Sequence, residues 1–293
     1  PVSQARGLGG PMRDAVTLRQ LLDETTSVIG ERHEARWLLE VAASLDGPDL
    51  DDSLDEPATV RMVQHLDEMV ARCRAGEPLP YVLGRWSFRH LDLAVDRRVL
   101  IPRPETELVA GVAIDLARDV GPERTVVDLG TGSGAIGLSL ARELPLDGTT
   151  VWITDASADA LAVATANLAG IGRPARNVRT ALGSWFDPLP DGRRFDVVVS
   201  NPPYVAEDSP MLEASVRDWE PAIALFGDDS GIGPITTIVE QAVHRLAPGG
   251  WLVLEIGSDQ GRSVRMLLDE HDYTDVEIRP DLAGLDRIAI GRR

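Results

Sequence analysis

Apolar residues near the start of the chain recur at intervals of three and four positions, as Leu18, Leu21 and Leu22 illustrate. This spacing gathers apolar side chains on one side of a helix. The pattern continues through 14–75, so this stretch is expected to form a small helical domain. Asp, Pro and Gly are concentrated in 46–57, which predicts a loop between two of its helices.

The pattern then changes to short alternating stretches at 81–83, 87–95 and 99–101, which are separated by turn residues such as Gly84. Alternation of apolar and polar residues is typical of strands with one buried face. We therefore expect 77–103 to form a β-hairpin-like connector.

Beyond residue 104, strand-like apolar runs alternate with helical segments. The expected strands are 125–129, 149–154, 177–181, 195–200, 250–255, 274–279 and 287–291. The expected helices between them include 135–144, 158–168, 235–246 and 261–268. Such alternation predicts a mostly parallel sheet with helices on both faces. No helix separates the last two strands, so they are predicted to pair as an antiparallel hairpin at the edge of a seven-stranded sheet.

With 293 residues, the chain is long enough for two domains. We expect an N-terminal helical domain in 1–76, the connector in 77–103 and an α/β domain in 104–293. The apolar fraction of 43% and the charged fraction of 26% are typical of soluble globular proteins.

The formal net charge of -18 disfavours polyanionic partners, because it repels phosphate backbones and anionic lipid headgroups. All of the positive side chains are Arg, since the sequence contains no Lys. The pairs Arg97-Arg98 and Arg193-Arg194 are compatible with a local basic patch, but solvated loop charges are the simpler interpretation. We expect no direct nucleic-acid partner and no membrane partner.

Cys73 is the only cysteine, so neither a disulfide within the chain nor a Cys-based metal site is expected. The five His residues show no spacing suited to a metal, and we predict none. Segment 1–11 is polar and Gly-rich, and no apolar run reaches about 18 residues, which argues against export and membrane insertion. These features favour a cytoplasmic protein.

A glycine-rich run, Asp-Leu-Gly-Thr-Gly-Ser-Gly in 128–134, ends the first strand of the α/β domain and opens a helix. Glycines let a ligand approach the backbone closely, and the helix N-terminus offers free N–H groups. This pattern predicts a nucleotide-type cofactor loop. Gly130, Gly132 and Ala135 also fit the dinucleotide fingerprint, so the loop alone leaves NAD open.

Asp155 ends the second strand of this domain, where a carboxylate can accept hydrogen bonds from both hydroxyls of a ribose. Capping of the following helix is the alternative, although Ser157 competes for that position. A ribose is common to NAD and S-adenosylmethionine, so Asp155 does not distinguish them. Trp185 follows the third strand, where an aromatic ring can border an adenine or simply pack.

The segment Asn201-Pro202-Pro203-Tyr204 follows the fourth strand and distinguishes the two cofactors. The carboxyl ends of neighbouring parallel strands lie at one edge of a sheet, so this turn is expected beside the glycine loop. An amide or exocyclic amino nitrogen is a weak nucleophile, because its lone pair is delocalised. The Asn201 side-chain oxygen and the Pro202 carbonyl can hold its two hydrogens, so that the nitrogen faces a methyl group at about 3 to 3.5 Å.

The two prolines fix the directions of their carbonyls and add no competing N–H donors, while Tyr204 can stack on the planar group. Positive charge disperses when a methyl group leaves a sulfonium, so positioning and a dry pocket matter more than a strong base. A rigid turn with a packed tyrosine is the structural alternative. The segment therefore indicates S-adenosylmethionine-dependent methylation of an amide-type nitrogen.

From about residue 79 onward the chain resembles the release-factor glutamine N5-methyltransferases (PrmC or HemK), which have the class I (Rossmann-like) S-adenosylmethionine methyltransferase fold. The matching segments are Pro80-Tyr81-Val82-Leu83-Gly84 with Phe88, the run Leu-Ile-Pro-Arg-Pro-Glu-Thr-Glu in 100–107, the glycine loop, Asn201-Pro202-Pro203-Tyr204, Glu220-Pro221 with Ala224-Leu225, and Glu255-Ile256-Gly257 with Gln260. Within these segments 103–107 is the most specific, because nucleic-acid amino methyltransferases can share Asn-Pro-Pro-Tyr but lack that run.

The resemblance implies methyl transfer from S-adenosylmethionine, with S-adenosylhomocysteine as product, to the glutamine of the Gly-Gly-Gln motif in class I peptide chain release factors. Such a reaction would modulate translation termination, and the helical domain would help to hold that protein partner. The implied cofactor contacts are Gly130, Thr131, Gly132, Ser133, Gly134, Asp155, Trp185 and Asn201. The implied glutamine contacts are Asn201, Pro202, Pro203 and Tyr204, of which Asn201, Pro202 and Tyr204 are the expected catalytic residues. Residues 103–107 would shape the pocket, unless Glu105 and Glu107 simply cap the next helix.

Three other functions are compatible with parts of the sequence. A DNA or RNA adenine or cytosine amino methyltransferase would use the same Asn-Pro-Pro-Tyr chemistry, although the acidic net charge disfavours it. An NAD-linked oxidoreductase would use the same glycine loop. A non-catalytic adaptor could keep the fold, but the motif residues are intact.

Overall fold

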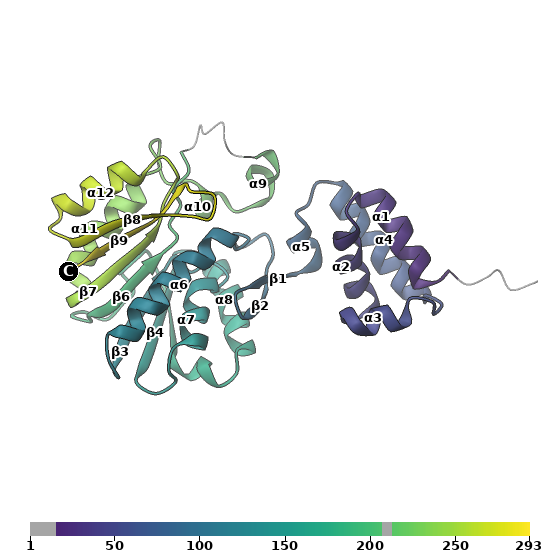
Figure 1. Cartoon of the computed structure of the whole chain (residues 1–293), viewed down its shortest axis with the longest axis horizontal. Coiled ribbons are helices and arrows are strands. Elements are labelled where there is room, and N and C mark those ends of the chain that lie inside the picture. The colour runs from purple at the N-terminus through teal and green to yellow at the C-terminus, as the bar shows by residue number, and fades with distance from the viewer. Residues whose placement is uncertain (1–15, 207–212) are drawn as a thin grey trace, which may run out of the picture. The chain divides into compact units, whose positions relative to one another are not determined.

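The computed structural model describes residues 16–206 and 213–293, and the polar segment 1–11 lies outside them. The chain divides into two compact units, Pro1–Leu83 and Gly84–Arg293. Each unit is described by itself, with the element labels of Figure 1.

The first unit is built of helices. They are α1 (Leu18–Ile29), α2 (Arg32–Ala43), α3 (Gly47–Ser53), α4 (Val60–Arg74) and α5 (Leu79–Leu83). A capping box begins α1, because Thr17 Oγ1 accepts the Gln20 N–H at 3.3 Å and Gln20 Oε1 accepts the Thr17 N–H at 2.9 Å. The apolar sides of the helices meet in a single core around Leu38, Leu39 and Leu50, which are fully buried. The helical character expected from the sequence is confirmed.

The segment 46–57 was expected to be a loop but contains helix α3. Pro48 stands in the first turn of this helix, where its missing N–H costs nothing, and Leu50 is buried in the core of the unit. The prediction was wrong here because burial of one leucine outweighs a local composition that favours turns.

Residues 81–83 were expected to be extended, as part of the connector, but they end helix α5. Arg72 fixes this helix: its guanidinium donates to the Tyr81 carbonyl at 3.0 Å and pairs with Glu77 at 2.8 Å. The helical unit therefore reaches Leu83, whereas the sequence placed the boundary at residue 76.

The second unit contains two sheets. A hairpin of β1 (Arg85–Phe88) and β2 (Leu91–Ala94) precedes the large sheet. The large sheet comprises β3 (Arg124–Leu129), β4 (Thr149–Asp155), β5 (Val178–Leu182), β6 (Phe195–Ser200), β7 (Leu246–Glu255), β8 (Thr274–Pro280) and β9 (Asp286–Arg292). Its strand order is β5-β4-β3-β6-β7-β9-β8, with β3 to β7 parallel and β9 antiparallel to both of its neighbours. The predicted seven-stranded, mostly parallel sheet with an antiparallel terminal hairpin is confirmed.

Helices cover both faces of this sheet. The helices of this unit are α6 (Pro104–Asp119), α7 (Ala135–Glu143), α8 (Ala158–Gly170), α9 (Ala214–Trp219), α10 (Ala222–Leu225), α11 (Gly233–Arg245) and α12 (Gly261–Glu270), with a short 3-10 helix at Arg173–Asn177. Helix α6 contacts β6 and β7 and lies with α7 in Figure 1, whereas α11 contacts β7 and α12 contacts β8 and β9. Within 16–206 and 213–293, no helix is both long enough and apolar enough to cross a membrane.

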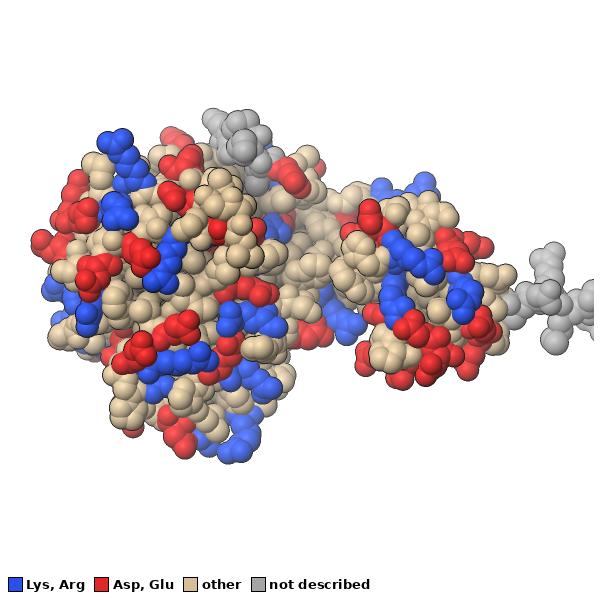
Figure 2. Space-filling view, in the orientation of Figure 1, with Lys and Arg blue, Asp and Glu red and all other residues tan. Residues whose placement is uncertain are grey.

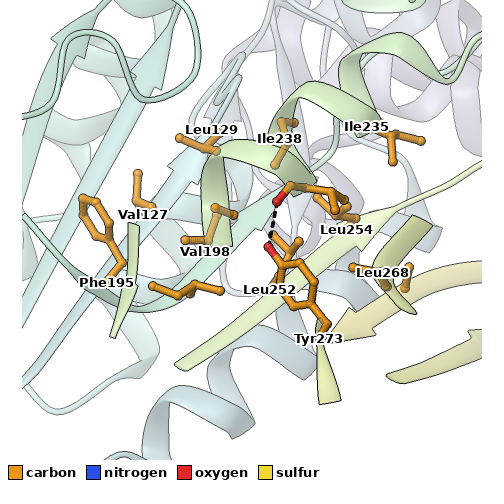
Figure 3. Packing of buried hydrophobic residues seen from close by; sticks show 14 of the residues in the cluster. Val127, Leu129, Phe195, Val198, Ile235, Ile238, Leu252, Leu254, Leu268 and Tyr273 are labelled. Atoms are coloured by element: carbon orange, nitrogen blue, oxygen red, sulfur yellow. Dashed lines mark hydrogen bonds between the residues drawn. The ribbon is translucent and has the colours of Figure 1, made fainter. Parts of the chain in front are cut away.

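Figure 3 shows the core on the face that α11 and α12 cover, where Phe195 and Val198 of β6 belong to the same buried cluster as Ile238. Tyr273 is held in this core by a 2.9 Å hydrogen bond from its hydroxyl to the Val239 carbonyl. The alternate residues of β6, such as Val197, are also fully buried, as expected for a parallel strand that is covered on both faces.

The direction of strand addition reverses between β3 and β6, since β4 lies on one side of β3 and β6 on the other. Open α/β sheets bind ligands at such a switch point, beside the carboxyl ends of the strands. A hydrogen bond joins the carboxyl ends of β6 and β3, because the Ser200 hydroxyl donates to the Leu129 carbonyl at 2.7 Å. The loops that follow Leu129 and Ser200 are therefore neighbours.

Candidate active site

The glycine loop connects β3 to α7 at this switch point. Gly130, Gly132 and Gly134 have positive φ angles of 69°, 56° and 89°, a region that glycine adopts without strain. Gly134 is the N-cap residue of α7, so the loop presents backbone N–H groups at the positive end of a helix. This geometry suits an uncharged or negatively polarised part of a ligand close to the backbone.

Asp128 lies beneath the loop and is only 1% exposed. Its Oδ2 accepts hydrogen bonds from the Thr131 hydroxyl at 2.5 Å and from the Gly137 N–H at 2.9 Å. Its Oδ1 is buried and has no hydrogen-bond partner among the described residues. Burial raises the pKa of this carboxyl to about 7. A buried oxygen without a partner is costly, so Asp128 is suited to accept a donor from a ligand.

A cavity of about 290 Å³ opens above these residues. Of the residues predicted to contact the cofactor, it is lined by Gly130, Thr131, Gly132, Ser133, Asp155, Trp185 and Asn201. Gly134 does not line it. A Cβ atom at Gly134 would lie 2.8 Å from Leu138 Cδ1, so glycine at this position serves the shape of the loop.

Asp155 ends β4 beside the glycine loop. Its Oδ2 accepts the Gly132 N–H at 2.9 Å and its Oδ1 accepts the Ser157 N–H at 2.8 Å, while burial raises its pKa. The side-chain cap of α8 is Ser157, whose Oγ accepts the Ala160 N–H at 3.2 Å. Asp155 is thus not the side-chain cap of α8, and it lines the cavity.

Trp185 lies against the glycine loop at Gly130. A Cβ atom at Gly130 would lie 3.4 Å from Trp185 Cζ3, which places the indole beside the loop. Thr154 fixes the backbone of this residue, because its hydroxyl donates to the Trp185 carbonyl at 3.1 Å. Trp185 both lines the cavity and packs against the core, so its position is compatible with either role considered from the sequence.

The segment 201–204 lies between the first cavity and a second one of about 220 Å³. Asn201 lines both cavities, Pro203 lines the first, and Pro202 and Tyr204 line the second. The chain beyond the turn is held by a hydrogen bond of 3.0 Å from the Val205 N–H to the Leu225 carbonyl. Asn201 therefore stands where the two cavities meet.

A hydrogen-bonded network surrounds Asn201. Its Nδ2 lies 3.3 Å from Thr106 Oγ1, and the Thr106 hydroxyl donates to Glu255 Oε2 at 2.6 Å. The Tyr204 hydroxyl donates to Glu255 Oε1 at 3.1 Å and lies 3.4 Å from Arg287 Nη1. Burial raises the pKa of Glu255 and of Tyr204, so the tyrosine is a neutral phenol.

The sequence indicated that residues 103–107 shape the pocket as a group. In the structure these residues make different contacts. Arg103 lines the second cavity and pairs with the buried carboxylate of Glu220, while Thr106 lines the first cavity. Glu107 Oε1 instead accepts the Arg89 N–H at 3.0 Å, in the turn of the β1–β2 hairpin. Neither Glu105 nor Glu107 lines either cavity.

Three residues at the site had no individual role assigned from the sequence: Asp128, Thr106 and Glu255. Asp128 is the first residue of the glycine-rich run. Thr106 and Glu255 belong to segments that resemble the release-factor glutamine methyltransferases. Their roles depend on contacts between residues up to 149 positions apart, as between Thr106 and Glu255. No spacing within a local motif reports such contacts.

The first cavity is acidic, because Asp128 and Asp155 line it. Arg98, which also lines it, is paired with Asp96 at 2.6 Å. A cationic ligand is therefore favoured over the pyrophosphate of a dinucleotide. On the face of the second unit that Figure 2 shows, Arg side chains lie interspersed with Asp and Glu. Among the described residues, no group of three His, Cys, Asp or Glu side chains could hold a metal ion.

Two family models match the chain: the PrmC N-terminal domain over residues 18–84 and the methyltransferase small domain over residues 113–217. The release factor glutamine methyltransferase of Neisseria gonorrhoeae is 41% identical over 88% of this chain and 92% of its own length. That of Salmonella typhimurium is 37% identical over 94% of this chain and 97% of its own length. A methyltransferase from Pyrococcus furiosus shares the fold, at 18% identity and a TM-score of 0.51, over 77% of this chain and 98% of that structure.

The chain belongs to the release factor glutamine methyltransferase family. It is an S-adenosylmethionine-dependent protein-glutamine N5-methyltransferase with the class I fold, as the resemblance of its motifs indicated. The NAD-linked and adaptor alternatives are thereby set aside. S-adenosylmethionine carries a sulfonium and an ammonium group. These fit the two carboxylates of the first cavity and Asp128 Oδ1, for which the described part of the chain offers no hydrogen-bond partner.

Proposed function

We propose that this methyltransferase modifies the glutamine of the Gly-Gly-Gln motif in class I peptide chain release factors, in the cytoplasm, and thereby modulates translation termination. The observation that carries the proposal is the position of Asn201, which lines both cavities. One cavity takes the methyl donor and the other takes the glutamine side chain. The family membership supports the same substrate.

The first cavity offers a contact for each part of S-adenosylmethionine. The backbone of the glycine loop from Gly130 to Ser133 shapes its floor, Asp155 accepts the ribose hydroxyls and Trp185 borders the adenine. Asp128 Oδ1, which has no partner among the described residues, accepts the ammonium group. Bound in this way, the cofactor supplies an electrophilic methyl group on its sulfonium.

The second cavity holds the glutamine amide against the Asn201 to Tyr204 turn. The Asn201 Oδ1 and the Pro202 carbonyl accept the two N–H hydrogens, so the nitrogen is directed at the neighbouring cavity. Pro203 adds no competing donor, and the Tyr204 ring lies beside the planar amide. Asn201, Pro202 and Tyr204 are therefore the residues that we assign to catalysis.

Positioning provides most of the acceleration in this scheme. A carbon–nitrogen bond forms while the carbon–sulfur bond breaks, and the positive charge moves from sulfur to nitrogen. The methylated nitrogen then loses a proton to solvent and becomes a neutral secondary amide. Because the nitrogen loses its proton after the methyl arrives, a strong general base is not required.

We further propose that the first unit, 16–83, contributes to binding of the release factor. Its match to the PrmC N-terminal domain supports this role. Its surface carries partly exposed apolar side chains, including Trp37 at 38% exposure, whose ring lies edge-on to His33 at 5.1 Å. Exposed aromatic side chains are common anchors at protein interfaces.

The test is methyl transfer from labelled S-adenosylmethionine to a purified class I release factor. The matched control is the same factor with the motif glutamine replaced by alanine, which should take up no label. An oligonucleotide pool incubated in parallel measures the nucleic-acid alternative. Labelling of the oligonucleotides at a rate equal to that of the release factor would contradict the proposal.

A further inference from the structure

Glu255 ends β7 next to the Asn201 to Tyr204 turn and is 1% exposed. Both of its carboxylate oxygens accept hydrogen bonds from side chains of the protein. Oε2 accepts the Thr106 hydroxyl at 2.6 Å, and Oε1 accepts the Tyr204 hydroxyl at 3.1 Å. In its ionised form Glu255 has no proton to donate, so both hydroxyl protons then point toward its oxygens.

The direction of the Thr106 proton determines how Asn201 is oriented. A hydroxyl has one proton, and that of Thr106 is given to Glu255. Toward Asn201 the Thr106 oxygen can therefore only accept, and Asn201 Nδ2 lies 3.3 Å from it. The two ends of an asparagine amide have the same shape, so it is this chain of donors that fixes which end faces the cavities.

We propose that Glu255, acting through Thr106, is a positioning residue that fixes the Asn201 amide with its oxygen toward the substrate. This inference rests on the proposed function, in which Asn201 Oδ1 accepts a hydrogen of the glutamine amide. If the Asn201 amide turned over, its NH2 group would face the NH2 group of the substrate. Two donors would then meet, and the glutamine would lose one of the two acceptors that orient it.

The second oxygen of Glu255 fixes the other end of the same turn. The Tyr204 hydroxyl donates to Oε1 and accepts from Arg287 Nη1 at 3.4 Å. The Tyr204 carbonyl accepts from Gln260 Nε2 at 3.1 Å. One buried carboxylate thus orients both Asn201 and Tyr204, which are the first and last residues of the turn.

Glu255→Gln tests the direction of the hydrogen bonds with almost no change of shape. The new NH2 group can only donate, so one of the two hydroxyls loses its acceptor. If that hydroxyl is Thr106, its proton turns to Asn201 and the asparagine amide turns over. If it is Tyr204, the phenol receives hydrogens from the new NH2 group and from Arg287, and its own proton has no acceptor. Either arrangement should lower kcat by about 10²-fold.

Thr106 gives a second, independent set of variants. Thr106→Val removes the hydroxyl at constant shape and should lower kcat by about 10²-fold at saturating cofactor and release factor. Thr106→Ser keeps the hydroxyl and should restore most of the activity. Thr149→Val is the matched control, since Thr149 is also buried, donates to the Pro145 carbonyl at 2.6 Å and lines neither cavity. It should leave kcat unchanged.

A double-mutant cycle separates positioning from a general loss of structure. In the Asn201→Ala background there is no amide to orient, so adding Thr106→Val should change kcat by less than about threefold. Calorimetry with S-adenosylhomocysteine should show that Thr106→Val keeps its affinity within about threefold. The loss should therefore be one of kcat and not of cofactor binding.

The outcomes separate this inference from the function on which it rests. An active wild type whose Glu255→Gln and Thr106→Val variants keep its kcat would overturn the inference alone. So would a Thr106→Val effect of the same size with and without the Asn201 side chain. A wild type that does not methylate release factor would refute the proposed function and, with it, the inference.

Discussion

Gly137 in helix α7 offers a direct test of how tightly the cofactor loop is packed. A Cβ atom at this position would lie 2.3 Å from Ile153 Cγ2 and 3.1 Å from Asp128 Oδ2. Ile153 is fully buried in β4 and cannot move into solvent. We therefore expect Gly137→Ala to push the start of α7 away from the sheet.

The magnitude follows from two opposing effects. Alanine in place of glycine favours a helix by about 1 kcal/mol. Overpacking of a close-packed interior costs about 1–3 kcal/mol, and a separation of 2.3 Å is far inside the contact distance of two carbon atoms. So deep a clash puts the cost near the upper end of this range, and the net result should be a loss of roughly 2 kcal/mol in the free energy of unfolding. For a unit of this size the melting temperature should fall by roughly 4–8 °C.

Gly170→Ala, at the end of helix α8, is the matched control. Nothing lies within 4 Å of a Cβ atom at Gly170, so this change should be neutral or stabilise by up to about 1 kcal/mol. Thermal and urea unfolding of both variants measure the difference. Gly137→Ala should also weaken S-adenosylhomocysteine binding, because the Gly137 N–H donates to Asp128 at 2.9 Å. A Gly137→Ala protein as stable as Gly170→Ala would refute the packing argument.

Three further predictions concern the site. Asp128 has a pKa of about 7 and must be ionised to accept a cation, so affinity for S-adenosylhomocysteine should fall as the pH drops through 7. Calorimetry should show that the affinity of the wild type falls about tenfold between about pH 8 and pH 6, whereas that of Asp128→Asn should change little. An equally steep fall in the affinity of Asp128→Asn would contradict this role. Asn201→Ala should retain cofactor binding but lose about 10²–10³-fold in kcat, and normal turnover of this variant would disprove the role of Asn201. Arg103→Ala leaves the buried Glu220 carboxylate without its ion-pair partner, so the free energy of unfolding should fall by about 3 kcal/mol in urea unfolding. An unchanged urea midpoint would argue against a structural role for the pair.

The sequence predicted the sheet well because its central strands, β3, β6 and β7, contain apolar runs that are followed by glycine or polar residues. The strand 195–200, for example, is observed at Phe195–Ser200, and the terminal hairpin is where the missing helix placed it. Helix α3 was missed because its composition favours turns, while the burial of Leu50 and the contacts of Arg36 with Gly47 and Asp51 stabilise it. Residues 81–83 were misread because a three-residue apolar stretch does not distinguish a strand from a helical turn.

The motif residues of the site were likewise visible in the sequence, and seven of the eight expected cofactor contacts line the first cavity. What the sequence did not show is how distant segments contact one another. Asp128 and Glu255 look like ordinary acidic residues at strand ends. Only the folded chain shows that Asp128 Oδ1 has no partner within 16–206 and 213–293, and that the Glu255 carboxylate joins Thr106 to Tyr204. Such contacts depend on strand order and register, which local patterns do not encode.

We propose that the nitrogen of one glutamine side chain in a release factor receives the methyl group. Fragmentation mass spectrometry of a class I release factor, incubated with this enzyme and S-adenosylmethionine, locates the methyl group. We expect a single added methyl group on the side-chain nitrogen of the Gly-Gly-Gln glutamine, and far less of it after the same incubation with the Asn201→Ala enzyme. An unmodified glutamine, or a methyl group on another residue, would contradict it.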